Sequence, residues 1–425
     1  MDKKITVMTI SDHPLLPSGV GTQTKYVIEA LLNSEKFDVI SLGGAVKHQD
    51  YTPRKVEGYP GNWEIFPVDG YGNPDIIRDF LKDRKPDILY FMTDPRFYQW
   101  LWEIDDEIRK VVPMVYYHVW DNKPYPIFNE GFYKSNDFIA CISKVTHDIV
   151  TNVTPEVKSQ YVPHAVTSDV FKIPETESEK LAVENLKLQI LGEEFYKSDK
   201  KIFFWNNRNA RRKQSGSLVF WFKDFIDQVG RDKAVLVMHT DPLDPHGQNL
   251  NYLCHTLELT RDNILISDKK LPSSELAKFY QAADFTVNIS DAEGFGLATL
   301  ESLSCGTPII VTMTGGLQEQ VTNGKDWFGY GIKPASSAII GSQQVPYIYE
   351  DRISRQDFVA TMRKAIRTKP EKYNKMVEGG INHVRENYNF DDFSNTWVEL
   401  MENVHNENGS WETRKNYSPW ECIEI

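Results

Sequence analysis

The sequence is poor in cysteine and contains no long hydrophobic run. Its four cysteines (Cys141, Cys254, Cys305 and Cys422) are scattered and form no Cys-x-x-Cys pair, which argues against a zinc site of the usual ligand spacing. No stretch of roughly 18 apolar residues occurs, so no transmembrane helix is expected. The N-terminus MDKKITVMTISD is too short and too polar for a signal peptide. These absences predict a cytoplasmic protein with reduced thiols.

Basic residues are in the minority. The chain has 48 Lys and Arg against 60 Asp and Glu, a net charge of -12, which does not favour bulk electrostatic binding to nucleic acid or to anionic lipid. Hydrophobic residues make up 40% and charged residues 25%, which excludes disordered and collagen-like classes. At about 150 residues per domain, 425 residues predict two domains.

Apolar strand-like runs alternate with helix-like segments over most of the chain. The first is Ile5–Ile10, and it is followed by the glycine-containing turn Pro17–Gly21 and a helical pattern. The same rhythm restarts at Lys201–Trp205. This alternation predicts parallel sheets covered by helices on both faces. The other expected strands are 39–42, 88–91, 115–119, 138–142, 161–163, 234–239, 263–267, 285–289 and 308–311.

The fold class is therefore α/β, with two Rossmann-like domains in series. We expect an N-terminal domain over 1–165 and a C-terminal domain over 201–390. A charged helical segment over 166–200 interrupts the rhythm between them, and 391–425 forms a C-terminal helix and tail that could pack back on the N-terminal domain. Doubly wound sheets bind ligands outside the carboxyl ends of their strands, so a ligand would lie in the cleft if the domains face each other.

The sharpest motif is SDAEGFGLATLESLSCGTPIIVT at Ser290–Thr312. An expected strand ends at Ser290, and after a glycine-rich bend a helix begins near Gly296. The free amides at a helix start can bind an anion, so the amides of Gly294, Phe295, Gly296 and Leu297 are candidates for a diphosphate. Glu293 before the helix would then hold a sugar and Glu301 within it a ribose diol. A plain strand–turn–helix with solvated carboxylates is the alternative.

Cationic and imidazole side chains follow other expected strands. Arg208 and Lys213, five residues apart after Lys201–Trp205, could neutralise a diphosphate leaving group, although Arg211 and Arg212 lie between them. A simple basic loop is the alternative. His118 ends the strand 115–119, where it is either functional or a satisfied core residue.

Two further clusters of residues are candidate sites. Ser18 and Gly19 in the first glycine turn could approach a donor phosphate, or could form only a tight strand–helix turn. The segment MHTDPLDPHG brings together two histidines and two aspartates, but its prolines indicate an irregular loop, and we expect no metal there.

The motif at Ser290–Thr312 resembles the E-x7-E motif of retaining, family-4-type glycosyltransferases with the GT-B fold. Glu293 and Glu301 stand at its two glutamate positions, and Gly315-Gly316 follows as in the family. The resemblance also covers Arg208, Lys213 and the Ser18-Gly19 loop. A softer similarity, through WNNRNARRKQ, is to glycosyltransferases of large phages and giant viruses. At His164-Ala165 the chain departs from the family's usual Asn-Gly.

The resemblance implies transfer of a sugar from a nucleotide-sugar to a hydroxyl of a glycan, lipid or protein, with retention and without a metal or other cofactor. His118 would reach the sugar near its reacting carbon. One alternative acceptor is a hydroxymethylated DNA base, because Lys47, Arg54 and Lys55 could line a basic groove with the cations at 208–213. A sugar-nucleotide epimerase or a phosphorylase on the same fold is another alternative. The oligomeric state is not predicted.

Overall fold

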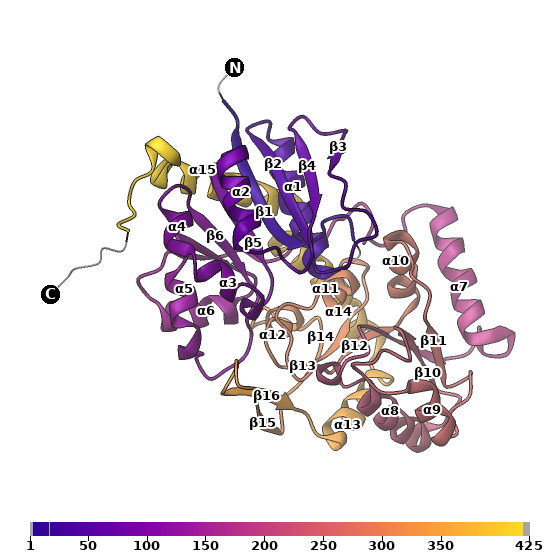
Figure 1. Cartoon of the computed structure of the whole chain (residues 1–425). Coiled ribbons are helices and arrows are strands. Elements are labelled where there is room, and N and C mark those ends of the chain that lie inside the picture. Colours follow the sequence, from indigo (N-terminus) through magenta and orange to yellow (C-terminus); the bar gives the residue numbers. More distant parts are fainter. Residues whose placement is uncertain (1–2, 17, 420–425) are drawn as a thin grey trace. The chain divides into compact units, whose positions relative to one another are not determined.

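The computed structural model describes residues 3–16 and 18–419, which fold into two compact units (Figure 1). The first unit takes its residues from Met1–Ala165, Gly341–Ile348 and Phe390–Ile425. The second unit consists of Val166–Ile340 and Tyr349–Asn389, so the segment 166–200 belongs to it. Pro17 of the first glycine turn and Cys422 lie outside the described residues.

A largely parallel sheet forms the centre of the first unit. Its strands lie in the order β3-β4-β2-β1-β5-β6-β7-β8. Within the part of the chain that the structure describes, the β3–β4 pair is antiparallel and the other pairs of this sheet are parallel. Strands such as β5 are buried along their whole length, as expected when helices cover both faces of a sheet. The bounds are β1 (Ile5–Asp12), β2 (Phe37–Gly44), β3 (Arg54–Val56), β4 (Trp63–Pro67), β5 (Ile88–Met92), β6 (Met114–His118), β7 (Phe138–Cys141) and β8 (Ser159–Tyr161).

The helices of the first unit follow the strands in the predicted alternation. They are α1 (Gly19–Asn33), α2 (Pro74–Arg84), α3 (Gln99–Trp102), α4 (Asp105–Arg109), α5 (Glu130–Lys134), α6 (Lys144–Val153) and the C-terminal α15 (Phe390–Asn408). The start of α1 is set by Ser18, whose hydroxyl accepts a hydrogen bond from the Gly21 amide at 2.9 Å.

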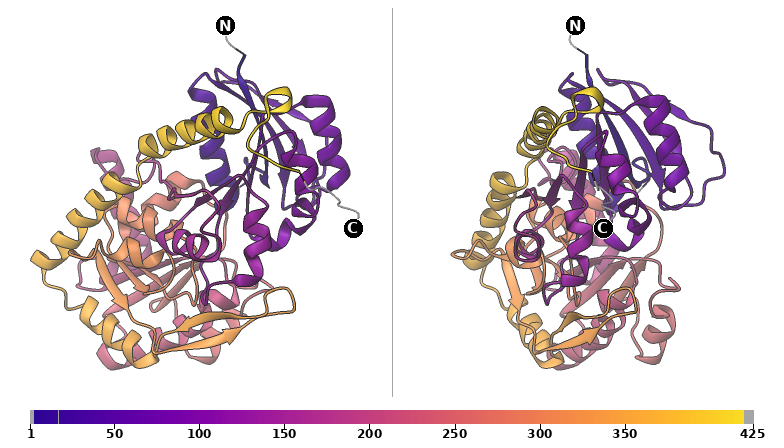
Figure 2. Two further views of the ribbon diagram at one scale, coloured as in Figure 1. Left: turned by 90° about the vertical axis from the view of Figure 1, so that its left-hand side faces the viewer. Right: turned by 60° about the vertical axis from the view of Figure 1, so that its left-hand side comes forward.

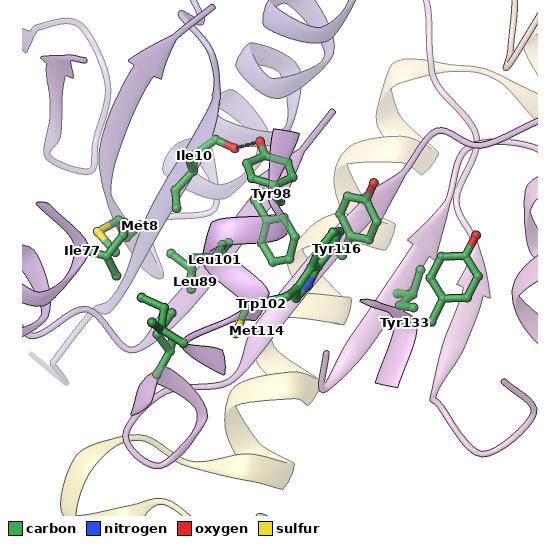
Figure 3. Packing of buried hydrophobic residues seen from close by; sticks show 14 of the residues in the cluster. Met8, Ile10, Ile77, Leu89, Tyr98, Leu101, Trp102, Met114, Tyr116 and Tyr133 are labelled. Atoms are coloured by element: carbon green, nitrogen blue, oxygen red, sulfur yellow. Dashed lines mark hydrogen bonds between the residues drawn. The ribbon is translucent and has the colours of Figure 1, made fainter. Parts of the chain in front are cut away.

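Aromatic side chains fill much of the first core (Figure 3). The Tyr98 hydroxyl donates a hydrogen bond to the Ile10 carbonyl at 2.7 Å, so a phenol is buried with its polar group satisfied. Tyr116 stacks on Phe91 with ring centroids 4.9 Å apart and meets Trp102 edge to face. This packing fixes β6, the strand that ends in His118.

The C-terminal helix α15 belongs to the first unit although it follows the second in sequence (Figure 2). Its Trp397 is fully buried and meets the rings of Tyr90 and Tyr117 edge to face, at 5.5 Å and 4.8 Å. Beyond the helix, Arg414 forms a buried ion pair with Asp137 at 2.8 Å. The first unit is therefore built from both ends of the chain.

The second unit has a fully parallel sheet with the strand order β11-β10-β9-β12-β13-β14. The order reverses direction between β9 and β12, which is the topological switch point of the sheet. The bounds are β9 (Lys201–Asn206), β10 (Ala234–His239), β11 (Ile264–Ser267), β12 (Phe285–Asn288), β13 (Ile309–Thr312) and β14 (Gly329–Ile332). A separate two-stranded sheet pairs β15 (Ser336–Ile340) with β16 (Ile348–Arg352).

The helices of the second unit complete its α/β layers. The segment 166–200 contains α7, which begins at a capping box formed by Thr176 and Glu179. The bounds are α7 (Glu177–Phe195), α8 (Ser215–Val229), α9 (Leu250–Thr256), α10 (Ser273–Ala282), α11 (Leu297–Ser304), α12 (Leu317–Val321), α13 (Arg355–Ala365) and α14 (Pro370–Asn387). Among the described residues, none of the helices is long and apolar enough to cross a membrane.

Candidate functional site

The switch point of the second sheet brings two loops together. One loop follows β9 and carries the cations at 208–213, and the other follows β12 and carries the Glu293 motif. Because β9 and β12 are parallel neighbours, both loops leave the sheet at its carboxyl edge. The position is the one at which open α/β sheets bind ligands.

Lys213 and Glu293 form an ion pair at this edge. The Lys213 Nζ donates to Glu293 Oε2, and both side chains are about one-tenth exposed. Arg212 lies 3.9 Å from the same carboxylate oxygen, and the Ser290 hydroxyl donates to it at 3.4 Å. Burial alone would raise the pKa of Glu293, but Lys213 and Arg212 outweigh burial and hold it below its ordinary value. Glu293 is therefore an anion at neutral pH.

The other cations of the loop have different partners. Arg208 is exposed and forms a bidentate pair with Asp244 at 2.6 Å and 3.2 Å, and it also contacts His246. Hydrogen bonding from Arg208 lowers the pKa of Asp244. Arg211 pairs with Glu350, and Arg212 donates to the Ala292 carbonyl at 2.6 Å. Of the two predicted cations, only Lys213 contacts a residue of the Glu293 loop in this structure.

Glycine is required at two positions in and beside the Glu293 loop, because a side chain there would clash with its neighbours. Gly296 has a φ of 92°, and a Cβ there would lie 2.6 Å from Leu317 Cδ2. A Cβ on Gly316 would lie 2.7 Å from the Gly294 carbonyl oxygen, so the Gly315-Gly316 turn packs closely on this loop. The helix α11 begins at Leu297, next to the predicted start near Gly296, and no side chain of the described residues caps it. Its first turn can therefore offer amides to an anion.

Glu301 lies within α11, and its carboxylate accepts a hydrogen bond from the Tyr280 hydroxyl at 2.7 Å. Tyr280 in turn accepts from the Asn206 amide at 2.8 Å. Burial raises the pKa of Glu301 to about 7, and the Tyr280 hydrogen bond only partly opposes the shift. Glu301 is thus set to change charge near neutral pH, while Glu293 is not.

Glu301→Gln is expected to remove a pH dependence of stability. A folded-state pKa raised from 4.5 to about 7 means that the stabilisation from this carboxyl is fully present below pH 4.5 and is lost as the pH rises through about 7. Glutamine does not titrate, so the free energy of unfolding of the variant should increase relative to that of the wild type as the pH rises from 4.5 to about 7. Urea unfolding at a series of pH values measures the difference. A difference that stays constant with pH would contradict the assignment.

His118 is completely buried in the first unit. One ring nitrogen, Nε2, lies 2.8 Å from the Tyr133 hydroxyl, and Nδ1 has no hydrogen-bond partner among the described residues. Burial lowers the pKa of His118 to about 3, so the ring is neutral. His164 is likewise buried, and Tyr117 contacts its Nδ1 at 2.8 Å. The role of His118 at a sugar stays a prediction, because burial is equally typical of a core histidine.

The first glycine turn has a local structural role. Ser18 caps α1, and its hydroxyl donates to Asp12 at 2.6 Å. Gly19 is the first residue of the helix. A Cβ on Gly21 would lie 2.9 Å from the His13 carbonyl oxygen. These contacts explain the loop sequence by the strand–helix turn, and a contact of Ser18 or Gly19 with a donor phosphate stays a prediction.

Several residues of the site region were not expected from the sequence. Asp291, Glu350 and Arg352 form ion pairs beside the Lys213–Glu293 pair, and Tyr280 and Ser290 bond to the two motif glutamates. Ser290 and Asp291 are the first two residues of the motif and could have been suspected from their position. Glu350 and Arg352 lie in a stretch that carries no motif. Within 3–16 and 18–419, the structure holds no group of three or more His, Cys, Asp or Glu side chains arranged for a metal.

Comparisons with known proteins agree with this geometry. Residues 193–380, which carry both loops, match the family described as glycosyl transferases group 1. An alpha-monoglucosyldiacylglycerol synthase of Streptococcus pneumoniae is 30% identical over 181 residues, which is 42% of this chain. The chain covers only 38% of that relative's length. The sequence comparisons therefore agree with the enzyme class predicted from the motif, a glycosyltransferase, over the segment that carries both loops.

Solved structures resemble nearly the whole chain. A sucrose-phosphate synthase from Thermosynechococcus elongatus covers 95% of this chain and 100% of its own, with a TM-score of 0.74 and 15% identity. The Anabaena protein Alr3699/HepE, solved with UDP and glucose, covers 94% of this chain and 100% of its own, with a TM-score of 0.66 and 12% identity. The predicted α/β fold of the GT-B type, with Rossmann-like domains and parallel sheets, is confirmed.

Proposed function

We propose that this protein transfers a sugar from a nucleotide-sugar donor to a hydroxyl acceptor with retention at the anomeric carbon. The observation that carries the proposal is the Lys213–Glu293 pair at the switch point, inside the segment that matches the glycosyl transferases group 1 family. In a nucleotide-sugar the diphosphate and the sugar are adjacent. A buried cation can bind the diphosphate, and a buried anion beside it can accept hydrogen bonds from the sugar hydroxyls.

Lys213 stabilises the charge that develops on the departing diphosphate. The ammonium exchanges part of its contact with Glu293 for the phosphate oxygens, so no metal is required. Arg212 is the second cation in reach of this point, because it already lies 3.9 Å from the Glu293 carboxylate. Arg208 can contact the diphosphate only if its ion pair with Asp244 breaks. The uncapped first turn of α11 adds backbone amides.

Glu293 accepts hydrogen bonds from hydroxyls of the donor sugar, and Glu301 accepts from the ribose diol. An ionised carboxylate is the stronger acceptor for both contacts. Because the pKa of Glu301 is about 7, donor affinity should weaken as the pH falls below 7. In this proposal the acceptor oxygen attacks the anomeric carbon on the same face from which the diphosphate departs, so the configuration is retained. The departing phosphate oxygen takes the proton of the acceptor hydroxyl.

A thermal-unfolding panel tests the donor. Uridine, guanosine and adenosine diphosphate sugars are added to the wild type and to the Lys213→Met variant. UDP-glucose is the first choice, because a neighbour of this fold was solved with UDP and glucose. A bound donor at 100 times its Kd stabilises the folded state by about 2.7 kcal/mol. No shift with any of the three would contradict the proposal.

Product analysis separates the proposal from other enzymes on the fold. Acceptors carrying glycan, lipid or protein hydroxyls are supplied in turn, and nucleoside diphosphate is measured. Release that requires an acceptor supports a transferase, whereas acceptor-independent turnover indicates an epimerase or a phosphorylase. The anomeric configuration of the product is read by NMR, and an inverted product would contradict retention.

A DNA base as acceptor is not favoured by the contacts of the second unit. Of the cations assigned to a basic groove, Arg208 and Arg211 are paired with carboxylates, and Lys213 is paired with Glu293. Binding to duplex DNA that weakens steeply with salt would revive this acceptor.

A further inference from the structure

Strand β16 ends beside the donor loops with two charged residues that no motif marks. Glu350 is 5% exposed, and Arg352 lies two residues further along the strand. The segment 335–356, to which both belong, resembles nothing in the family pattern of the sequence. Buried charges are costly unless they are paired and hydrogen-bonded, so their partners indicate what they are for.

Glu350 binds the turn that carries Lys213. Its two carboxylate oxygens accept from the two terminal nitrogens of Arg211 at 2.7 Å and 2.6 Å, which is the bidentate geometry of the strongest ion pairs. Arg211 begins the short 3-10 turn Arg211–Lys213. The turn ends at Gln214, whose φ of 55° lies in the left-handed region. Such a turn keeps its shape only when its surroundings fix it.

Asp291 ties the same turn to the Glu293 loop. Its amide donates to the Arg212 carbonyl at 2.8 Å, and its carboxylate accepts from the Gln214 side chain at 2.6 Å. Arg352 pairs with the Asp291 carboxylate, and the Asp351 amide donates to the Asp291 carbonyl at 2.9 Å. Arg352 also contacts Glu350 at 3.2 Å, which closes the network.

We propose that Glu350, with Arg352 and Asp291, is a positioning residue that holds the Lys213 and Glu293 side chains in register for the donor. Glu350 fixes the turn on the N-terminal side of Lys213. Asp291 fixes the C-terminal side of the same turn and lies two residues before Glu293. Both act on the Lys213–Glu293 pair through the turn and the loop that carry it. This inference rests on the proposed function of that pair.

Glu350→Gln is the first test. Glutamine carries no charge, so the bidentate ion pair with Arg211 is lost and the turn Arg211–Lys213 shifts. A displacement of about 1 Å at a reacting group can lower turnover about 100-fold, so we expect a loss of 10- to 100-fold in kcat/KM. Glu350→Asp keeps the charge and should recover part of the loss. Glu275→Gln, which breaks an exposed pair with Lys278 on α10, is the matched control and should keep wild-type activity.

A pH profile distinguishes positioning from a purely structural role. Lys213 lowers the pKa of Glu293, so a looser Lys213 should let that pKa rise. Glu301, with its pKa of about 7, would dominate the acid limb of kcat/KM, so the profile is measured in a Glu301→Gln background. There, adding Glu350→Gln should move the acid limb to higher pH. A loss of stability with an unmoved acid limb and wild-type kcat/KM would overturn the proposal.

A second variant guards against misfolding of the first. Arg211→Gln changes a half-exposed side chain and leaves Glu350 paired with Arg352, so it should fold and show the same kinetic signature. Wild-type kinetics in this variant would also overturn the proposal. If instead Lys213→Met keeps its turnover, the proposed function fails, and that result is separate from the behaviour of Glu350.

Discussion

Lys213→Met should lower kcat about 100- to 1,000-fold, because it removes a fixed cation from the point where the diphosphate departs. Methionine fills a similar volume, so the loss reports charge and not shape. Lys213 is the cation chosen for this test, because it is buried and contacts Glu293 directly. Steady-state kinetics with the donor identified by the thermal panel, extrapolated to saturation, provides the measurement.

Three further substitutions serve as the control and the comparison for Lys213→Met. Lys223→Met removes a partly exposed lysine that pairs with Asp227 on α8, and it should leave kcat unchanged. Arg208→Met and Arg212→Met, compared side by side, show which arginine assists Lys213. The larger loss is expected for Arg212, because Arg208 is held by Asp244. Turnover of Lys213→Met at the wild-type level would remove the site assignment.

The same Lys213→Met substitution should also destabilise the second unit by about 3 kcal/mol, since it leaves the Glu293 carboxylate buried without its main partner. Adding Glu293→Gln removes the uncompensated charge, so the double variant should be more stable than Lys213→Met alone. Its turnover should stay low. Urea unfolding followed by circular dichroism measures all three proteins, and a double variant less stable than the single one would contradict the account.

The stability difference between the wild type and Lys213→Met should depend on pH, and the direction of that dependence is a separate test of the Lys213–Glu293 pair. In the wild type, the pKa of Glu293 is lowered, so its stabilisation is present above pH 4.5 and is lost as the pH falls through the folded-state value. Without Lys213, burial dominates and the pKa rises. The contribution of Glu293 then falls as the pH rises, so the deficit of Lys213→Met should shrink in acid. A deficit that grows in acid would contradict the pairing.

The sequence predicted the strands that are buried on both faces. Runs such as Ile88–Met92 contain only apolar residues, and such runs are the signature of a parallel sheet. The edge strand β3 was missed because it is only three residues long and two of them, Arg54 and Lys55, are charged and exposed. The strand β14 was missed because Gly329 and Gly331 occupy half of it. Gly329 is required there, since a Cβ would lie 1.8 Å from the Ile309 carbonyl oxygen.

The candidate site was predictable where the chemistry is local and not where the partners are distant. Glu293 and Glu301 lie in one continuous motif, and Lys213 follows the strand that it should follow. Arg208 and Lys213 were expected to act together because of their spacing, yet each has its own carboxylate. Asp244, weighed as part of a metal cluster, is the partner of Arg208. The Arg211–Glu350 pair spans 139 residues of sequence, and no local pattern contains that information.

The return of α15 to the first unit has a consequence for the order in which the protein can form during synthesis. A ribosome releases residues 1–165 first, yet Trp397 and the Arg414 partner of Asp137 leave it more than 200 residues later. The second unit, Val166–Ile340 with Tyr349–Asn389, is complete before then. We therefore expect the domain that is made first to be finished last, with Tyr90 and Tyr117 lacking their partner Trp397 until α15 emerges.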